Sequence, residues 1–237
     1  MRLLVTRPDE DAAPLIAALH ARGHETVAAP LLDIRFLPPP VIPSASWQAI
    51  LVTSANGVRA LAHHPEAARL RAFRVIAVGE ASGEAVRAAG FKDVECAEGD
   101  VISLAALVLR RLAPAAGPLL HIAGSVTAGD LKGDLEARGF SVERIVLYEA
   151  VTSQTLPQSA RAALEVRGVD GVLLYSPRTA RTFATLVREA GLATFLSGVT
   201  GYCLSQAVAD ALAGLPFAEL AVAAAPSQAE LLKLIDA

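Results

Sequence analysis

The 237-residue chain has little to hold it together other than an apolar core. It contains two cysteines, Cys96 and Cys203, and one pair of thiols cannot staple a chain of this length, so a disulfide scaffold is excluded. Charged residues make up only 19% of the sequence and hydrophobic residues 53%. This composition, with a mean hydropathy of +0.44, excludes an intrinsically disordered chain. A chain of this length can bury a core without metals or disulfides.

Long hydrophobic runs and basic clusters are also missing. The longest apolar stretches, such as residues 104–109 and 220–226, fall far short of the roughly 20 residues that cross a bilayer. The first apolar run is three residues long and is followed at once by Arg7 and Asp9, unlike a signal peptide. The net charge is −3 and the pI is about 6.0, whereas a nucleic-acid binder carries a basic patch. We therefore expect a cytoplasmic protein with no membrane or nucleic-acid partner.

What the sequence does contain is a recurring unit of a short apolar strand, a small polar turn and an Ala/Leu-rich helix. Helices are predicted after all but the second strand, ending near residues 21, 63, 89, 138, 189 and 213. The predicted strands are residues 3–6, 25–34, 47–53, 74–78, 118–122, 171–175 and 200–204. Strands that alternate with helices favour parallel sheets, and their nearly continuous apolar character indicates burial on both faces. The predicted fold class is α/β, with helices on both faces of the sheets.

The chain also resembles itself in a permuted order. Residues 19–23 match 135–139, 51–55 match 173–177, 78–82 match 204–208, and the segment from Phe91 matches the segment from Phe217. Short windows of any α/β chain look alike, so the consistent order of the four pairs is what favours a repeat. We expect two similar lobes joined by a two-stranded linker. Their predicted bounds are residues 1–35 with 152–237 for a discontinuous domain, 39–146 for a continuous domain, and 36–38 and 147–151 for the linker strands.

Small polar residues gather in the turns where predicted strands end. In open α/β sheets, ligands bind at these carboxyl ends, beside helix N-termini whose free N–H groups and positive dipole attract anions. Ser, Thr and Asn in any single turn of this kind are usually just helix N-caps, but several turns meeting at one cleft favour an anion site. The candidate residues are Thr53, Ser54, Asn56, Gly79, Ser82, Gly124, Ser125, Ser176 and Thr179.

Motifs for cofactor or covalent chemistry are missing from the sequence. No G-x-G-x-x-G follows a strand, no G-x-S-x-G elbow occurs, and no cysteine has a neighbouring histidine. His63 and His64 have no further ligands at metal-site spacing, so we expect a solvent-exposed pair and no metal. A site of this kind works by positioning and electrostatics, without a cofactor.

Seven short motifs, in their order and spacing, resemble uroporphyrinogen-III synthases. They are residues 4–8 (LVTRP), 30–34 (PLLDI), 52–58 (VTSANGV), 78–80 (VGE), 148–150 (YEA), 175–180 (YSPRTA) and 225–227 (APS), and they span essentially the whole chain. The resemblance implies a monomeric, cofactor-free, two-lobed lyase of tetrapyrrole biosynthesis. Such an enzyme converts hydroxymethylbilane, which carries eight carboxylates, into uroporphyrinogen III with loss of water and inversion of ring D. A transient contact with hydroxymethylbilane synthase is a further expectation.

The resemblance also implies roles for individual residues. Tyr148 matches the family's tyrosine on the returning linker strand, which is proposed to assist departure of the hydroxyl as a hydrogen-bond donor. A tyrosine that caps the connection between the lobes is the equal alternative. Arg7 matches the family's N-terminal arginine, for which a structural salt bridge is the alternative. The turns that would meet substrate carboxylates contribute Thr53, Ser54, Asn56, Ser82, Ser125, Ser176 and Arg178.

One turn departs from the family pattern. The family often has Ile-Gly-x-Thr-Thr-Ala where this chain has residues 204–209 (LSQAVA), so Ser205 and Gln206 are candidates to replace the lost contacts. Three other interpretations stay open: a non-enzymatic two-lobed module that binds a tetrapyrrole or another polyanion, an unrelated two-lobed enzyme for another polyanion, and a flavodoxin-like cofactor protein.

Overall fold

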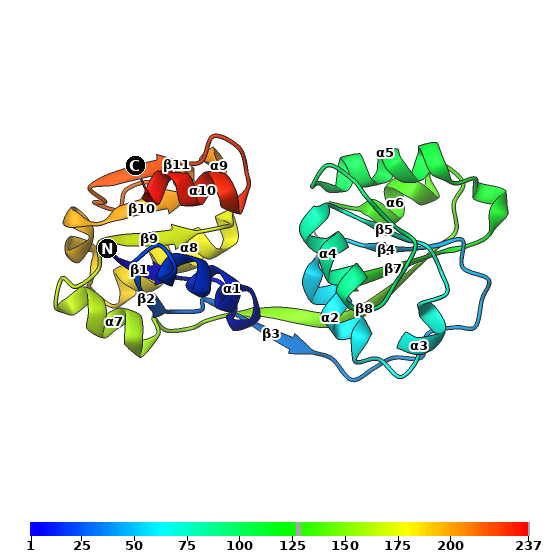
Figure 1. Cartoon of the computed structure of the whole chain (residues 1–237), viewed down its shortest axis with the longest axis horizontal. Helices are drawn as coiled ribbons and strands as arrows, with labels where there is room; N and C mark the ends of the chain where they lie inside the picture. Colours follow the sequence, from blue (N-terminus) through cyan, green and yellow to red (C-terminus); the bar gives the residue numbers. More distant parts are fainter. Residues whose placement is uncertain (127–128, 237) are drawn as a thin grey trace. The chain divides into compact units, whose positions relative to one another are not determined.

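The computed structural model describes residues 1–126 and 129–236. By its contacts the chain divides into two compact units. Unit 1 is Met1–Asp33 with Val151–Ala237, and unit 2 is Ile34–Ala150. Two strands that pair with each other, β3 (Leu32–Phe36) and β8 (Val142–Thr152), carry the chain from one unit into the other. Each unit has a parallel sheet with its own helices (Figure 1).

The sheet of unit 2 has the strand order β3-β8-β7-β4-β5-β6. Its parallel strands, besides β8, are β4 (Ala49–Val52), β5 (Val75–Ala77), β6 (Val94–Cys96) and β7 (Leu119–Gly124). Helices α2 (Ala55–Ala62) and α4 (Glu80–Ala88) cover one face, and α5 (Val101–Arg111) and α6 (Leu131–Glu136) cover the other. The short helices α3 (Ala67–Leu70) and η1 (Pro114–Ala116) lie in the connections.

Strand β4 shows why both faces are covered. Every residue of β4 is buried, and successive side chains of a strand point to opposite faces. Ile50 and Val52 therefore pack with α2 and α4, while Ala49 and Leu51 pack with α5 and α6. An uninterrupted apolar run is what a strand between two helical layers needs.

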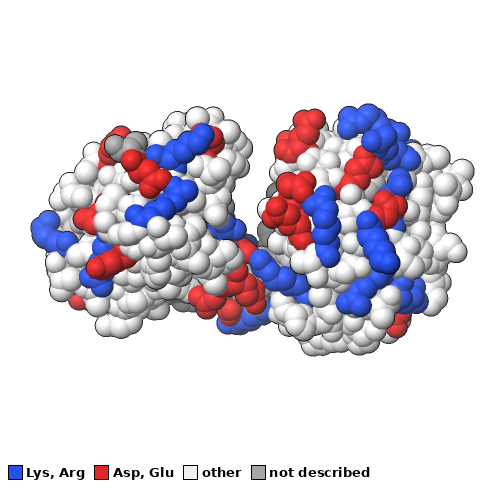
Figure 2. Space-filling model, viewed as in Figure 1, with Lys and Arg blue, Asp and Glu red and all other residues white. Residues whose placement is uncertain are grey.

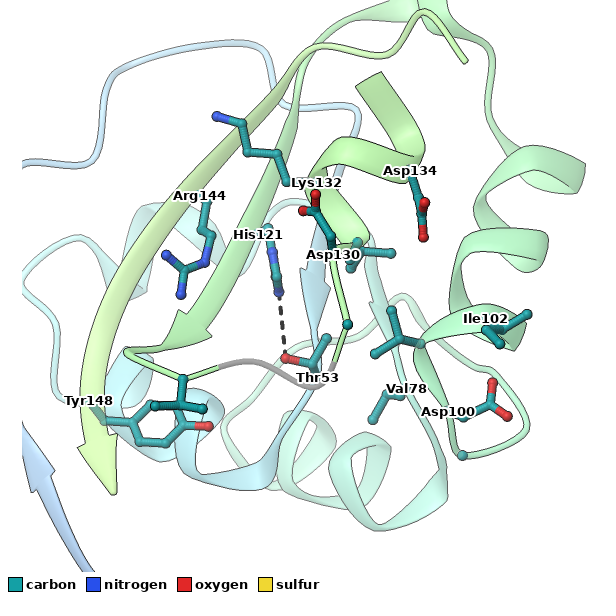
Figure 3. A pocket seen from close by; sticks show the side chains of 15 residues that line it. Thr53, Val78, Asp100, Ile102, His121, Asp130, Lys132, Asp134, Arg144 and Tyr148 are labelled. Atoms are coloured by element: carbon teal, nitrogen blue, oxygen red, sulfur yellow. Dashed lines mark hydrogen bonds between the residues drawn. The ribbon is translucent and has the colours of Figure 1, made fainter. Parts of the chain in front are cut away.

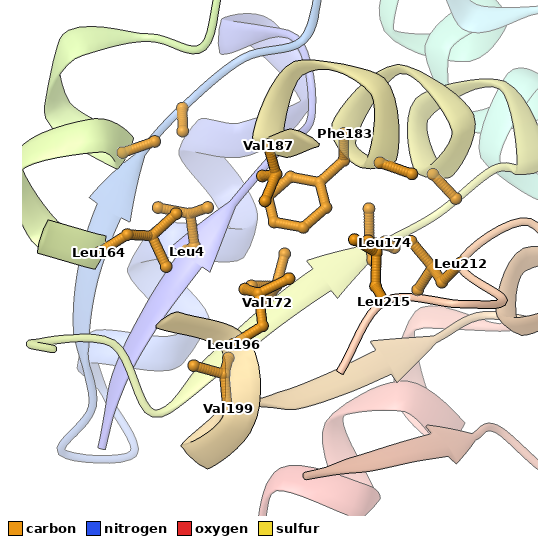
Figure 4. Close-up of a cluster of buried hydrophobic side chains, with 14 of the residues drawn as sticks. Leu4, Leu164, Val172, Leu174, Phe183, Val187, Leu196, Val199, Leu212 and Leu215 are labelled. Carbon is orange, nitrogen blue, oxygen red and sulfur yellow. The ribbon is translucent and has the colours of Figure 1, made fainter. Parts of the chain in front are cut away.

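Unit 1 has the strand order β11-β10-β9-β1-β2, and all five strands are parallel. They are β1 (Arg2–Val5), β2 (Glu25–Ala28), β9 (Gly171–Leu174), β10 (Thr200–Cys203) and β11 (Glu219–Val222). One face packs against α1 (Asp9–His20) and α10 (Gln228–Ile235). The other packs against α7 (Gln158–Glu165), α8 (Pro177–Glu189), α9 (Gln206–Asp210) and the 3-10 helix η2 (Ala193–Gly198). In that core Phe183 of α8 lies over the sheet beside Val187 (Figure 4).

The two sheets have the same topology. Five strands of unit 2 lie side by side in the order β6-β5-β4-β7-β8, which are the third, second, first, fourth and fifth of them along the chain. The strands of unit 1, in the order β11-β10-β9-β1-β2, correspond to these five one by one. The register extends the match to residues, because His121 lies opposite Leu51 as Val5 lies opposite Leu173. The α/β class with similar parallel sheets, predicted from the sequence, is confirmed.

Two local predictions of secondary structure are wrong. The single strand expected over 25–34 is two strands, interrupted at residues 29–31, where Pro30 lacks an N–H for a sheet hydrogen bond. The helix expected directly after Ser125 begins only at Leu131, because Asp130 caps it by accepting the Gly133 N–H at 3.0 Å. Ser125 therefore opens a loop, and Gly124 is the last residue of β7.

The expected solvent-exposed histidine pair is also wrong for one member. His64 is only 7% exposed, and its Nε2 lies 2.9 Å from the carbonyl oxygen of Pro40. His63 stays at the surface, with its ring 5.5 Å from that of Phe36. Within the described residues no group of three or more His, Cys, Asp or Glu side chains could hold a metal ion.

Charges of both signs lie side by side on the surface. On the displayed face of each unit, basic and acidic side chains are neighbours (Figure 2). Unit 2 contains the ion pairs Arg87–Glu80 at 2.5 Å, Arg111–Glu95 at 2.7 Å and Arg74–Asp93 at 3.0 Å. Among the described helices, none has both the length and the hydropathy to cross a membrane.

Gly171, at the start of β9, has no room for a side chain. A Cβ there would lie 2.5 Å from Cε2 of Tyr202 and 2.9 Å from Cδ2 of Leu3. We expect Gly171→Ala to lower the free energy of unfolding by about 2 kcal/mol through overpacking, measured by urea denaturation. Gly198→Ala is the matched control, because no atom lies within 4 Å of a Cβ at that glycine. Equal stability of the two variants would contradict the expectation.

Candidate functional site

In unit 2 the strand order reverses between β4 and β7. The chain leaves β4 through α2 on one face of the sheet and leaves β7 toward α6 on the other. Such a switch point opens a crevice at the carboxyl ends of the strands, where α/β proteins bind ligands. A cavity of about 600 Å³ lies here, called the switch-point cavity below (Figure 3). It is lined by Thr53, Val78, Gly99, Asp100, Val101, Ile102, His121, Val126, Gly129, Asp130, Leu131, Lys132, Asp134, Arg144 and Tyr148.

His121 is the most deeply buried polar side chain of this cavity. It sits in the middle of β7, 2% exposed, between Leu51 of β4 and Arg144 of β8. Its Nε2 lies 3.5 Å from Oγ1 of Thr53, while its buried Nδ1 has no partner among the described residues. Burial, and secondarily the charge of Arg144, lowers the pKa of His121 to about 4. The imidazole is therefore neutral at physiological pH.

Tyr148 reaches the cavity from β8, close to an irregularity in the pairing of β7 and β8. The register shifts between Ala123 and Gly124, so that Gly124 faces Tyr148. A Cβ on Gly124 would lie 2.7 Å from Cζ of Tyr148, and one on Gly57 would lie 3.6 Å from Cε1. Glycine at these positions lets the ring lie close over the end of β7, and the tyrosine is only 9% exposed. Figure 3 shows its hydroxyl turned toward the cavity.

Contacts with Arg144 and Tyr148 fix the chain directly after β7. Nη2 of Arg144 donates to the carbonyl oxygen of Gly124 at 2.6 Å and lies 3.5 Å from that of Ser125. The Ser125 N–H donates to the carbonyl oxygen of Tyr148 at 2.9 Å. The strand that carries Tyr148 thus also holds the wall of the cavity beside it.

Two of the three acidic residues of the lining, Asp100 and Asp130, cap helices. Asp100 caps α5 through the Ser103 N–H at 2.7 Å, and the hydrogen bonds from Ser103 hold the pKa of Asp100 below its usual value. Asp130 caps α6, as described above. Lys132 lies 3.6 Å from Glu136 in the next turn of the same helix. The sheet itself brings the hydroxyls of Thr53 and Tyr148 and the guanidinium of Arg144 to the cavity as possible donors to an anion.

The remaining predicted residues of unit 2 lie beside the cavity and do not line it. Ser54 caps α2 by accepting the Asn56 N–H at 3.1 Å, and the Asn56 side chain accepts from Arg59. Gly79 stands at the N-cap position of α4. A Cβ on Gly79 would lie only 3.0 Å from Cα of Gly99, so the loop after β5 packs closely against this wall of the cavity. Ser82 is buried in α4. Gly124 and Ser125 lie at the end of β7, as described above.

The predicted residues of unit 1 lie at the carboxyl ends of its own sheet. Arg7 follows β1, pairs with Asp11 at 3.3 Å and stacks over the ring of Tyr175 at 4.4 Å. Burial raises the pKa of Tyr175 to about 12, with Arg7 opposing the shift. Ser176 caps α8 by accepting the Thr179 N–H at 3.1 Å, and Arg178 lies in the first turn of that helix.

The turn that departs from the family pattern is also at a strand end. Ser205 stands at the N-cap of α9 without a side-chain capping bond. Nε2 of Gln206 donates to Oδ1 of Asp210 at 2.8 Å. This amide is therefore already used within its own helix.

Sequence reasoning missed His121, Arg144 and the lining contributed by α5 and α6. A signal for His121 was present, because it is the one polar side chain in the run Leu119–Ala123, and the repeat has valine, Val5, at the matching position. The residues of α5 and α6 carry no such signal, since only the fold brings them to the end of β7.

A family model described as Uroporphyrinogen-III synthase HemD matches residues 13–233. The chain belongs to the uroporphyrinogen-III synthase family. The resemblance predicted from the sequence motifs is thereby confirmed. No curated protein matches the chain by sequence.

Two solved structures of uroporphyrinogen-III synthases share the fold. The uroporphyrinogen-III synthetase of Helicobacter pylori is similar at a TM-score of 0.66, with 18% identity over 99% of this chain and 98% of that one. A mutant uroporphyrinogen III synthase from the extremely thermophilic bacterium Thermus thermophilus is similar at 0.59, with 16% identity over 100% of this chain and 97% of that one. Family membership makes this protein a lyase-type cyclising enzyme of tetrapyrrole biosynthesis, with a small-molecule tetrapyrrole as substrate.

Proposed function

We propose that the protein converts hydroxymethylbilane into uroporphyrinogen III, with loss of water, closure of the ring and inversion of ring D. The observation that carries this proposal is the family match over residues 13–233, which includes nearly all of both units. The switch-point cavity supports it, because Thr53 and Tyr148, both expected at the site from the sequence, line one concave surface.

The chemistry asks for shape and placed dipoles more than for a strong base. The unaided bilane also loses its hydroxyl and closes, but gives the uninverted isomer. The enzyme must therefore fold the substrate so that attack falls on the substituted carbon of ring D. In this proposal Tyr148 donates a hydrogen bond to the departing hydroxyl as the C–O bond breaks. The oxygen leaves as water, and the proton it takes up is balanced by the one that an α-carbon of ring D loses when the new C–C bond closes the ring.

The substrate carries eight carboxylates, yet the protein is not basic. The hydrogen-bond donors for these carboxylates must therefore include uncharged groups. Backbone N–H groups and small hydroxyls at helix N-termini provide them, which fits a chain with a net charge of −3. We propose that substrate-binding residues besides Thr53 are Arg7, Ser54, Asn56, Gly79, Ser82, Gly124, Ser125, Ser176, Arg178, Ser205 and Gln206. The proposal further comprises a cytoplasmic monomer of two domains that uses no cofactor and meets hydroxymethylbilane synthase transiently.

The decisive experiment couples the purified protein to an enzymatic source of hydroxymethylbilane. The products are oxidised, and the uroporphyrin isomers I and III are separated by chromatography. We expect predominantly isomer III, because ring inversion is the step that the unaided bilane does not perform. Isomer I alone, at the spontaneous rate, would contradict the proposal. Tight binding of the bilane without acceleration would instead identify a non-enzymatic tetrapyrrole-binding module.

A further inference from the structure

The internal repeat offers a comparison for His121. Val5 occupies the matching position on β1 of unit 1 and is fully buried among apolar side chains. At the matching position to Thr53, unit 1 has Tyr175, and Arg7 stacks on its ring. The same sheet is therefore built once with an apolar side chain at this point and once with a histidine. The fold therefore does not require an imidazole at this position. Because burying a polar group costs free energy, the presence of His121 calls for another explanation.

The burial of His121 selects one form of its ring. Only Nε2 has a partner, the Oγ1 of Thr53, and Nδ1 is enclosed without one among the described residues. A buried N–H donor left unpaired is rarer in proteins than an acceptor left under-used. The proton therefore resides on Nε2, which donates to Oγ1 of Thr53, and Nδ1 keeps a lone pair.

The direction of this bond decides where the Thr53 hydroxyl proton goes. With a lone pair of Oγ1 occupied by the imidazole, the O–H is left to donate elsewhere. Thr53 lines the switch-point cavity, at the carboxyl end of β4, so the cavity is the open direction for that proton. A hydroxyl held as a donor suits a carboxylate and not a cation.

We infer that His121 is a positioning residue, which holds the hydroxyl of Thr53 as a hydrogen-bond donor toward a carboxylate of the substrate in the switch-point cavity. This inference rests on the proposed function. The neutral ring does not itself bind the anion. It fixes the orientation of the sheet hydroxyl that does, so that less rotational freedom is lost when the carboxylate arrives.

The charged groups around the cavity fit this division of labour. Arg144, on the neighbouring strand, is engaged with the carbonyl oxygens of Gly124 and Ser125, while Asp100 and Asp130 are engaged as helix caps. Lys132 pairs with Glu136, and Asp134 lies on the same helix. A protonated His121 would place a buried cation beside the partly buried Arg144, whereas a neutral ring adds no charge and only orients the Thr53 hydroxyl.

The test compares His121→Val with His121→Gln. Valine is the residue that the other unit uses at this point, so the fold tolerates it. Glutamine keeps an N–H donor close to the position of Nε2. We expect His121→Val to raise KM for hydroxymethylbilane about tenfold with kcat within about twofold, because a peripheral carboxylate contact is made equally in ground and transition states. His121→Gln is expected to keep most of the affinity.

A double-mutant cycle with Thr53→Val separates positioning from independent contacts. If His121 acts through Thr53, the double variant has nearly the same KM as Thr53→Val alone. Additive effects of the two substitutions, or an unchanged KM in His121→Val, would overturn the inference. A wild-type protein that makes no uroporphyrinogen III would instead contradict the proposed function. That result is distinguishable from the two outcomes above, which concern only the variants.

Discussion

Replacing Tyr148 by phenylalanine is expected to lower kcat about 100-fold and to change KM less than about threefold. The reason is that the hydroxyl, in the proposed mechanism, interacts with the departing oxygen and gains strength only as the C–O bond breaks. Phenylalanine keeps the ring contacts above Gly124 and beside Gly57, so binding of the substrate is retained. Initial rates with hydroxymethylbilane, corrected for spontaneous closure, give both constants.

The control is Tyr202→Phe in β10 of unit 1. Tyr202 is a buried tyrosine of comparable exposure, 5% against 9% for Tyr148, but it packs inside its own unit against the helices α1 and α10. It should leave kcat unchanged. If Tyr148→Phe is as active as the wild type, the hydroxyl has no part in the reaction, and the alternative left open by the sequence, a tyrosine that caps the connection between the lobes, is favoured.

The parts of the site that the sequence predicted are those with local causes. Ser54 and Ser176 are recognisable because a small hydroxyl before an apolar helix is a capping signal, and both do cap α2 and α8. Thr53 is recognisable because it is the first residue after the apolar strand β4, which ends at Val52. The alternation of strand and helix likewise arises from short-range hydrophobic patterns, and it predicted the class of both sheets.

The parts that could not be predicted depend on how distant elements meet. The sequence around Ser125 does not show that the next helix begins only after Asp130. Gly124-Ser125 and Asp130 are both suitable residues for the start of a helix. The break in the predicted strand 25–34 is different, because Pro30 is a local signal for it that was present in the sequence. His64 is buried because Pro40, 24 residues earlier, lies against it.

The stability of the protein should carry an acid-sensitive component from His121. The folded pKa of about 4 lies below the ordinary 6.5, so between these values the unfolded chain binds a proton that the folded chain does not. The contribution is fully present above pH 6.5 and is lost as the pH falls to 4. A difference of that size corresponds to about 3 kcal/mol. We expect the free energy of unfolding of wild type to fall by about that much more than that of His121→Val between pH 7.5 and pH 4.

Urea denaturation of wild type and variant at the two pH values measures this difference. Carboxylates such as Asp100, whose pKa is lowered by its cap, also lose stabilising interactions on acidification, but they are common to both proteins and cancel in the comparison. Thr53→Val is the matched control. It removes the partner of the imidazole and leaves the burial that is the main cause of the shift, so it should retain most of the acid sensitivity. Parallel pH profiles for wild type and His121→Val would mean that the imidazole is protonated as readily in the folded chain as in the unfolded one. That result would contradict the neutral ring on which the orientation of the Thr53 hydroxyl depends.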